Sequence, residues 1–295
     1  MTQGIIHPVL ADASTTAVLA DFTAQIDVLS AAIIATVPAK ICNDRFPGEG
    51  RGGCAVAVTA AGGGAAGNLV AKSFLRSAPT ADLVINNGGG VRVSIDAGDY
   101  TINDAYTLLP FANTLIAIEM TGAQVVQVLE DTLTTTLDNG GSTGGYPYAA
   151  GLRFDVDASA AADARISSVE VNSQLAGTWA AIDAAKTYTV VTNSYLAGGK
   201  DGYLTFGAIP DAQKVNLYIE YAQAFIDYAE AEGTLVEPAQ AEFSTQSYVG
   251  ADGVWTGSSP APTTAPTTAP TTATSGAAAA ASASFLGIAA ATLFL

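Results

Sequence analysis

Histidine is almost absent from this chain, which has a single one, His7, followed by Pro8. Hydrolysis at a two-metal centre needs several histidine, aspartate and asparagine ligands on a fixed frame. The sequence contains no Asp-x-His, Gly-Asn-His or His-x-His string. We therefore expect neither a two-metal site nor a histidine-aspartate pair in this chain, and we assign no catalytic residue.

Basic residues are also scarce, because 11 Lys and Arg stand against 27 Asp and Glu, for a net charge of -16. Such a surface repels polyanions, so no nucleic acid polymer is expected as a partner. The 49% hydrophobic content of the 295 residues still allows one large or two modest domains with a buried core. Any pocket for a small anion must gather its few arginines locally.

Only two cysteines are present, Cys42 and Cys54, and the loop between them holds Pro47 and several glycines. A pair so close together, in a chain with other extracellular signs, predicts one disulfide that pins this loop. The alternative is a pair of free, buried thiols.

The N-terminal sequence MTQGIIHPVLADAS lacks both the basic start and the continuous apolar stretch of a secretory signal. We expect that residues are missing upstream, as in the C-terminal part of a longer protein. A reading frame that begins at an internal methionine is the alternative.

The C-terminal segment has no periodic apolar pattern, and its repeat APTTAPTTAPTTAT is typical of an extended, O-glycosylated stalk, assigned to residues 258–274. Small residues at Ser275-Gly276-Ala277, a spacer and an apolar end follow. This layout over residues 275–295 predicts a glycosylphosphatidylinositol signal with lipid attachment near Ser275, and thus an extracellular, membrane-anchored protein. The apolar end from Phe285 is shorter than the about 20 residues of a membrane-spanning helix. A disordered alanine-rich end is the alternative.

A glycine turn stands out in the middle of the chain. Asn87-Gly88-Gly89-Gly90-Val91-Arg92 directly follows the apolar run Leu83-Val84-Ile85, and Leu109-Pro110-Phe111 comes soon after. Glycines let a ligand approach the backbone closely, and the Arg92 guanidinium matches phosphate or carboxylate oxygens. A glycine turn, a cation and an aromatic plate together suit a nucleotide. An ordinary tight turn is the alternative.

Periodicity predicts the elements around this turn. Apolar residues at three- and four-residue steps predict helices over residues 12–34, 65–77, 121–133 and 217–231. The last of these carries Tyr218, Tyr221, Phe225 and Tyr228 on a face assigned to the core. Strands are predicted over residues 83–85, 114–120, 153–156, 166–171 and 188–192. Their alternation with helices favours an α/β domain with a mixed sheet.

Two sequence blocks carry a family resemblance. The first runs from Asn86 to Glu130 and includes Asn-Gly-Gly-Gly-x-Arg, Leu109-Pro110-Phe111-x-Asn113 and Met120-Thr121-Gly122. The second is Asn193-Ser-Tyr-Leu-Ala-Gly-Gly-Lys-Asp-Gly-Tyr203. In this order they resemble the substrate-binding C-terminal domain of the 5'-nucleotidase family of two-metal phosphoesterases. The resemblance implies a connecting helix within residues 1–38 and a substrate-binding domain over residues 39–250.

The resemblance also implies roles for single residues. Phe111 and Tyr195 match the aromatic pair that sandwiches the nucleobase, although the family has Phe at the second position. Asp201 matches the aspartate that accepts the ribose hydroxyls. Core packing of Phe111 and a turn role for Asp201 are the alternatives.

Phosphate contact is implied for Asn87, Arg92 and one arginine of the loop between the cysteines. We favour Arg51, which lies in the glycine-rich part near Cys54, over Arg45, which follows Asp44 and can pair with it. Either arginine can instead be a solvated surface charge.

By resemblance, the complete protein hydrolyses a nucleoside 5'-phosphate to nucleoside and phosphate, with two divalent metals held by an upstream metallophosphoesterase domain. This chain is expected to bind the nucleotide and to have no hydrolytic activity alone. A free-standing nucleotide-binding module and a stalked surface scaffold are the competing hypotheses.

Overall fold

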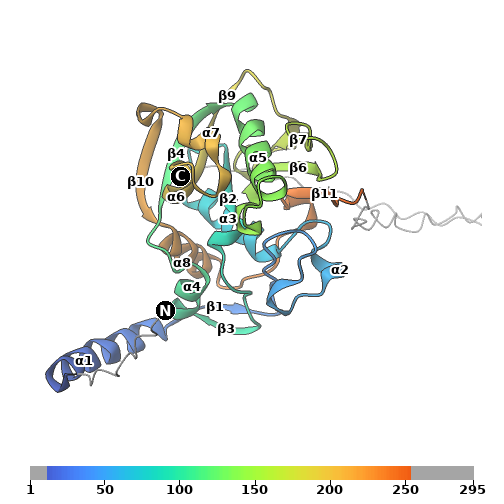
Figure 1. The fold of residues 1–295 in the computed structure, drawn as a ribbon. Helices are drawn as coiled ribbons and strands as arrows, with labels where there is room; N and C mark the ends of the chain where they lie inside the picture. The colour runs from blue at the N-terminus through green and yellow to red at the C-terminus, as the bar shows by residue number, and fades with distance from the viewer. Residues whose placement is uncertain (1–11, 254–295) are drawn as a thin grey trace, which may run out of the picture. The chain divides into compact units, whose positions relative to one another are not determined.

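Three sheets and the helices around them make up residues 12–253, which the computed structural model of the chain describes (Figure 1). The strands are β1 (Ile33–Val37), β2 (Leu83–Asn87), β3 (Gly98–Thr101), β4 (Thr114–Thr121), β5 (Pro147–Ala150), β6 (Leu152–Asp157), β7 (Ile166–Val171), β8 (Ala180–Ala181), β9 (Thr187–Asn193), β10 (Lys214–Glu220) and β11 (Thr245–Val249). The α-helices are α1 (Ala13–Ser30), α2 (Val56–Thr59), α3 (Ala65–Ser77), α4 (Ile102–Leu108), α5 (Gly122–Leu137), α6 (Ser194–Ala197), α7 (Leu204–Ala208) and α8 (Tyr221–Glu232). This is the α/β class that the sequence predicts.

The central sheet has the strand order β10-β4-β9-β2-β5, and it is mixed as predicted. Strands β2 and β9 run parallel, while the other neighbouring pairs run antiparallel. Two smaller sheets flank it, with the orders β11-β6-β7-β8 and β1-β3. The strands predicted over residues 83–85, 114–120 and 188–192 are therefore the middle of the central sheet.

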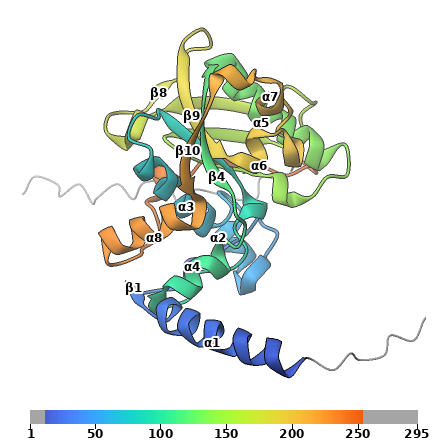
Figure 2. The ribbon, with the colours of Figure 1, turned by 90° about the vertical axis from the view of Figure 1, so that its left-hand side faces the viewer.

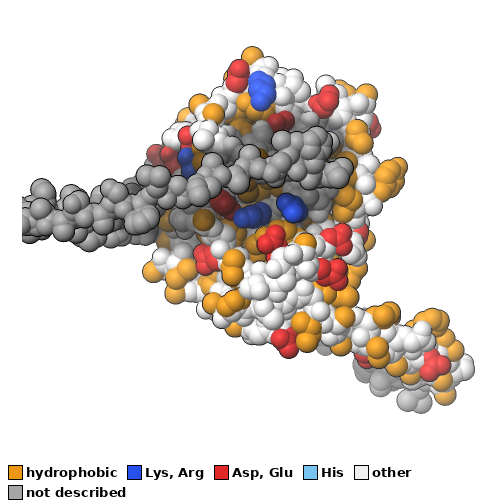
Figure 3. Space-filling model, turned by 180° about the vertical axis from the view of Figure 1, so that it is seen from behind, with side chains coloured by type: hydrophobic (Ala, Val, Ile, Leu, Met, Phe, Trp, Pro, Cys, Tyr) orange, Lys and Arg blue, Asp and Glu red, His pale blue; other side chains and the backbone are white. Residues whose placement is uncertain are grey.

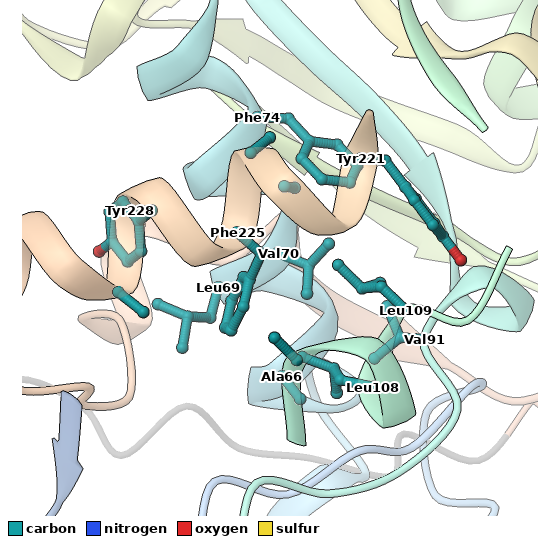
Figure 4. Packing of buried hydrophobic residues seen from close by; sticks show 14 of the residues in the cluster. Ala66, Leu69, Val70, Phe74, Val91, Leu108, Leu109, Tyr221, Phe225 and Tyr228 are labelled. Carbon is teal, nitrogen blue, oxygen red and sulfur yellow. The ribbon is translucent and has the colours of Figure 1, made fainter. Parts of the chain in front are cut away.

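Side chains of the central strands alternate between two hydrophobic cores. In β2, Val84 faces one core, whereas Leu83 and Ile85 face the other. The first core packs α3, α4 and α8 around Phe74, Tyr221 and Phe225 (Figure 4). Burial on both faces explains why β2 is a continuous apolar run rather than an alternating one.

Helix α5 covers the opposite face of the central sheet, together with α6, α7 and the four-stranded sheet (Figure 2). Its start is fixed by a capping box, in which Thr121 accepts from the Gln124 amide and Gln124 accepts from the Thr121 amide. Val125, Leu129 and Leu133 then fall on one buried face at helical spacing. The predicted helix after Met120 is thus confirmed.

The helix predicted over residues 217–231 is wrong in its first turn. Residues up to Glu220 form β10, which pairs antiparallel with β4, and α8 begins at Tyr221. Tyr221, Phe225 and Tyr228 are core residues as predicted, but Tyr218 is 87% exposed. Tyr218 has a positive φ of 57°, so it lies at an irregularity of the strand and not on the helix face.

Helix α1 confirms the start of the helix predicted over residues 12–34, but its predicted end is wrong, because the helix stops at Ser30 and Ile33 begins strand β1. The helix buries none of its residues. Val18, Leu19, Phe22, Ile26 and Leu29 are all more than half exposed, and hydrophobic side chains gather on this helix in Figure 3. Among residues 12–253, no helix is long and apolar enough to cross a membrane. His7, the stalk repeat, the anchor signal and Ser275 lie outside the described residues.

Candidate functional site

The site lies where the two parallel central strands end. Strand β2 ends at Asn87 and β9 ends at Asn193, and their parallel pairing brings both carboxyl ends to one edge of the sheet. Asn193 donates to the Oδ1 of Asn86 at 2.9 Å, so the buried strand ends are joined by their side chains. Crevices beyond the carboxyl ends of parallel strands are common ligand sites in α/β proteins.

The three glycines after β2 form a 3₁₀ turn, Gly88–Gly90, whose neighbours leave no room for side chains. A Cβ on Gly88 would lie 2.7 Å from the Arg45 carbonyl, and one on Gly89 would lie 3.0 Å from the Gly144 Cα. The turn thus lets two other loops approach its backbone. It also presents Arg92, whose guanidinium donates to the Gly89 carbonyl at 3.0 Å.

These loops enclose a cavity of about 320 Å³. It is lined by Arg45, Asn87, Gly89, Gly90, Arg92, Phe111, Asn113, Ser142, Gly144, Tyr195 and Asp201. Five of the six residues predicted to bind substrate are therefore brought together, from segments more than 100 positions apart. Arg51 is the exception.

Phe111 and Tyr195 are both partly exposed on the cavity wall, at 45% and 44%. The Phe111 backbone is anchored to the core, because its amide donates to the hydroxyl of the buried Tyr221 at 2.9 Å. The Arg92 guanidinium lies 5.5 Å from the centre of the Phe111 ring. Phe111 is therefore not a core residue, and its ring contacts a cation and faces the cavity.

Asp201 lies on the cavity wall within a short left-handed turn. Its φ is 54°, between Gly199 at 77° and Gly202 at 87°, a conformation that aspartate tolerates better than most residues. Both carboxylate oxygens accept hydrogen bonds: Tyr195 Oη donates to Oδ1 at 2.9 Å, and Asn87 Nδ2 donates to Oδ2 at 2.8 Å. The Asn87 amide, predicted as a phosphate ligand, is thus engaged with Asp201.

Of the two arginines between the cysteines, the structure places Arg45 on the cavity wall. The Asp44 carboxylate does not pair with it but is buried, where it accepts from the Gly50 amide and the Thr59 hydroxyl. Arg51 instead pairs with Glu49 at 2.9 Å. The geometry therefore favours Arg45 over Arg51 for contact with a ligand.

The Cys42–Cys54 disulfide is present and closes the loop that carries Arg45. The same loop contacts the glycine-rich loop after α5, since Glu49 accepts from the Thr143 hydroxyl at 3.1 Å. Burial and the nearby Arg92 and Arg51 lower the pKa of Arg45. Glu49 and Asp201 act in the opposite direction. The loop thus presents a partly buried cation near two other arginines, and a bound anion would stabilise its charge.

Outside the glycine turn and Arg45, three wall residues were not predicted to bind: Asn113, Ser142 and Gly144. Asn113 is part of the Leu-Pro-Phe-x-Asn motif, so the motif itself was a usable signal. Its Oδ1 accepts from the Ser194 hydroxyl at 3.4 Å. Ser142 and Gly144 belong to a glycine-rich loop after α5, and only the density of glycines marks that loop in the sequence.

The side chains described here do not suit a resident metal pair. Among residues 12–253, no group of three or more His, Cys, Asp or Glu side chains is placed to hold a metal ion. What the cavity offers is two aromatic rings, an oriented carboxylate and two arginines. This chemistry suits binding of a planar, hydroxylated anion.

Comparison with known proteins agrees with this picture. Residues 48–208 match the family model described as the 5'-nucleotidase, C-terminal domain. An NAD 5'-nucleotidase from Haemophilus influenzae is 44% identical over 170 residues, and a probable 5'-nucleotidase from Treponema pallidum is 40% identical over 152 residues. These alignments cover 56% and 51% of this chain, but only 28% and 25% of the relatives.

Solved structures show the same fold. The NAD nucleotidase of Haemophilus influenzae aligns with a TM-score of 0.65 at 35% identity, over 77% of this chain and 40% of that protein. A 5'-nucleotidase precursor from Thermus thermophilus aligns with a TM-score of 0.63 at 26% identity, over 78% and 42%. The chain therefore belongs to the 5'-nucleotidase C-terminal domain family.

Proposed function

We propose that this chain is the nucleotide-binding portion of a 5'-nucleotidase-like phosphoesterase. The observation that carries the proposal is the single cavity in which Phe111, Tyr195, Asp201 and Arg92 meet. Family membership supports a nucleotide as the ligand class.

In this proposal each part of a nucleoside 5'-phosphate has its own partner. The base stacks between Phe111 and Tyr195, an arrangement that any base allows, because every base has a π face. The ribose hydroxyls donate to Asp201, since a carboxylate accepts two hydrogen bonds side by side. Arg45 and Arg92 attract the phosphate, because guanidinium groups donate paired hydrogen bonds to phosphate oxygens. Burial, followed by the charges of Arg92 and Arg51, lowers the pKa of Arg45, and a bound anion would stabilise its charged form.

Hydrolysis of the phosphoester is assigned to a metallophosphoesterase domain upstream, in which two divalent metals supply the activated water. The relatives support this division, because this chain spans about a quarter of their length. The exposed apolar side chains of α1 are then a surface that such a domain covers, which fits the role of a connecting helix.

A place at the cell surface belongs to the same proposal. The Cys42–Cys54 disulfide suits an oxidising compartment. The Thr/Pro repeat and the small residues around Ser275 support a stalk and a lipid anchor. Release of the protein from host cells by a phosphatidylinositol-specific phospholipase, after addition of a signal peptide, tests the anchor; recovery of an intact Leu295 terminus would rule it out.

Calorimetric titration of the chain with adenosine monophosphate tests nucleotide binding. Loss of one stacking ring, in Phe111→Ala or Tyr195→Ala, is expected to weaken binding by about 5- to 100-fold, because a stacked base contributes about 1 to 3 kcal/mol. Tyr106→Ala is the matched control, since Tyr106 is exposed like Tyr195 but lies outside the cavity wall.

Equal affinity in the parent and in both ring variants would exclude this site and favour a surface scaffold. A free-standing nucleotide-binding module is the second candidate. It predicts the same binding but no metallophosphoesterase domain in the upstream reading frame, so the genomic sequence separates the two.

A further inference from the structure

Asp201 is held by two donors from different elements. Tyr195 comes from α6 after β9, and Asn87 comes from the end of β2. Each donates to a different carboxylate oxygen, at 2.9 and 2.8 Å. Because the oxygens are fixed separately, the plane of the carboxylate is fixed as well.

Both donors are anchored by one buried residue, Asn193, which is 1% exposed. Its amide nitrogen lies 3.5 Å from the Asn87 Oδ1, and its own Oδ1 accepts from the Leu196 amide at 3.0 Å. The second bond caps the first turn of α6, the turn that carries Tyr195. Asn87 and Tyr195 together form a clamp on Asp201, and Asn193 anchors this clamp to the buried ends of β2 and β9.

The clamp leaves a defined acceptor pattern. An ionised carboxylate has about four lone-pair positions on its two oxygens, and the two clamp bonds occupy one on each. One position per oxygen therefore remains. Two acceptors at this spacing match the two donors of a vicinal diol, whereas a sugar with a single hydroxyl leaves one of them without a partner.

We propose that the Tyr195 hydroxyl and the Asn87 amide are positioning groups that aim Asp201 at the vicinal diol of ribose, so that the cavity favours ribonucleotides over deoxyribonucleotides. This inference rests on the proposed function. It gives Tyr195 a second task beside stacking, one that a phenylalanine at this position lacks. The hydrogen bond to Asp201 also raises the pKa of Tyr195, so its hydroxyl remains a donor well above neutral pH.

The test compares adenosine monophosphate with its 2',3'-dideoxy analogue, which keeps the base and the phosphate but has no diol. Tyr195→Phe in the full chain retains the ring, and the partly exposed position tolerates it. It is expected to weaken binding of adenosine monophosphate by about 3- to 10-fold, the usual effect of one lost hydrogen bond, and to leave the dideoxy analogue within about twofold.

A double-mutant cycle supplies the second arm. In an Asp201→Ala background the Tyr195→Phe change should have no further effect on adenosine monophosphate, because its target is gone. Asn87→Ala should show the same diol-dependent loss, with thermal unfolding measured alongside because Asn87 is buried.

An equal loss of affinity for both ligands in Tyr195→Phe would overturn the inference, because the hydroxyl would then support only the stacking of the ring. No loss of affinity for either ligand would also overturn it, because the hydroxyl would then contribute nothing to binding. If the parent chain binds neither ligand, the proposed function fails and the inference falls with it. Binding of both ligands by the parent, with no diol-dependent loss in the variants, overturns the inference alone.

Discussion

At the scale of single residues, the position of a charge depends on contacts that neighbours in sequence do not reveal. Arg45 follows Asp44, and adjacency suggests an ion pair. The Asp44 carboxylate instead accepts hydrogen bonds from the Gly50 amide and the Thr59 hydroxyl, and Arg45 lies on the cavity wall. A loop with several positive-φ glycines folds back on itself in ways that spacing alone cannot indicate. The motif residues Phe111, Tyr195 and Asp201, by contrast, all lie on the wall of one cavity, and their contacts with a nucleotide stay predictions.

Arg45→Ala is expected to weaken binding of adenosine monophosphate by about tenfold or more, because a hydrogen bond to a charged group contributes about 1.5 to 3 kcal/mol. Adenosine, which has no phosphate, should bind the variant as it binds the parent. Arg51→Ala is the matched control and should change either affinity by less than about twofold, since its exposed pair with Glu49 contributes little. A larger effect of Arg51→Ala, seen by calorimetry, would reverse the assignment.

The pH dependence of binding follows from Tyr195. The hydrogen bond to Asp201, then burial and the charge of Asp201, raise its pKa above the usual 10. The neutral hydroxyl and its bond are therefore present at low pH and are lost only as the pH rises past that raised pKa. Affinity for adenosine monophosphate should be constant between about pH 8 and pH 9.5, where the phosphate stays ionised. A titration below pH 9.5 in the parent that is absent from Tyr195→Phe would contradict this.

At the scale of elements, the longer helices and three of the five central strands could be predicted, because amphipathic periodicity is local. Helix α3 matches its predicted bounds, Ala65–Ser77. Strand β10 was missed since Tyr218, Tyr221, Phe225 and Tyr228 mimic helical spacing across a strand and a helix. Its strand conformation is specified by pairing with β4, about 100 residues away, and no local window contains that partner.

The disulfide is the element that fixes the Arg45 loop. Replacing both cysteines by serine is expected to lower the free energy of unfolding by about 2 to 3 kcal/mol, because the bond closes a loop of this size. The expected loss of affinity is larger for adenosine monophosphate than for adenosine, since Arg45 is proposed to contact the phosphate, which adenosine lacks. Chemical denaturation and calorimetry measure both effects. Unchanged affinity for both ligands would show that the loop holds its shape without the bond.

At the scale of the whole molecule, the proposal that hydrolysis belongs to an upstream domain makes a direct prediction about this chain. The purified chain should show no phosphomonoesterase activity with added zinc, manganese or magnesium, because residues 12–253 offer no cluster of metal ligands. Release of phosphate from adenosine monophosphate is the measurement. Turnover that survives chelation and repurification, and that increases with the amount of this chain, would contradict it.

The walls of the cavity come from distant parts of the chain, from Arg45 to Asp201. No contiguous fragment contains both the Arg45 loop and the second aromatic ring unless it spans most of the domain. Binding at this cavity is therefore coupled to folding of the entire domain, and we expect no nucleotide affinity in a half-folded chain. A nucleotide at 100 times its dissociation constant would add about 2.7 kcal/mol to the stability of the native state. The melting temperature of the chain would then measure how much of the proposed nucleotide site is occupied.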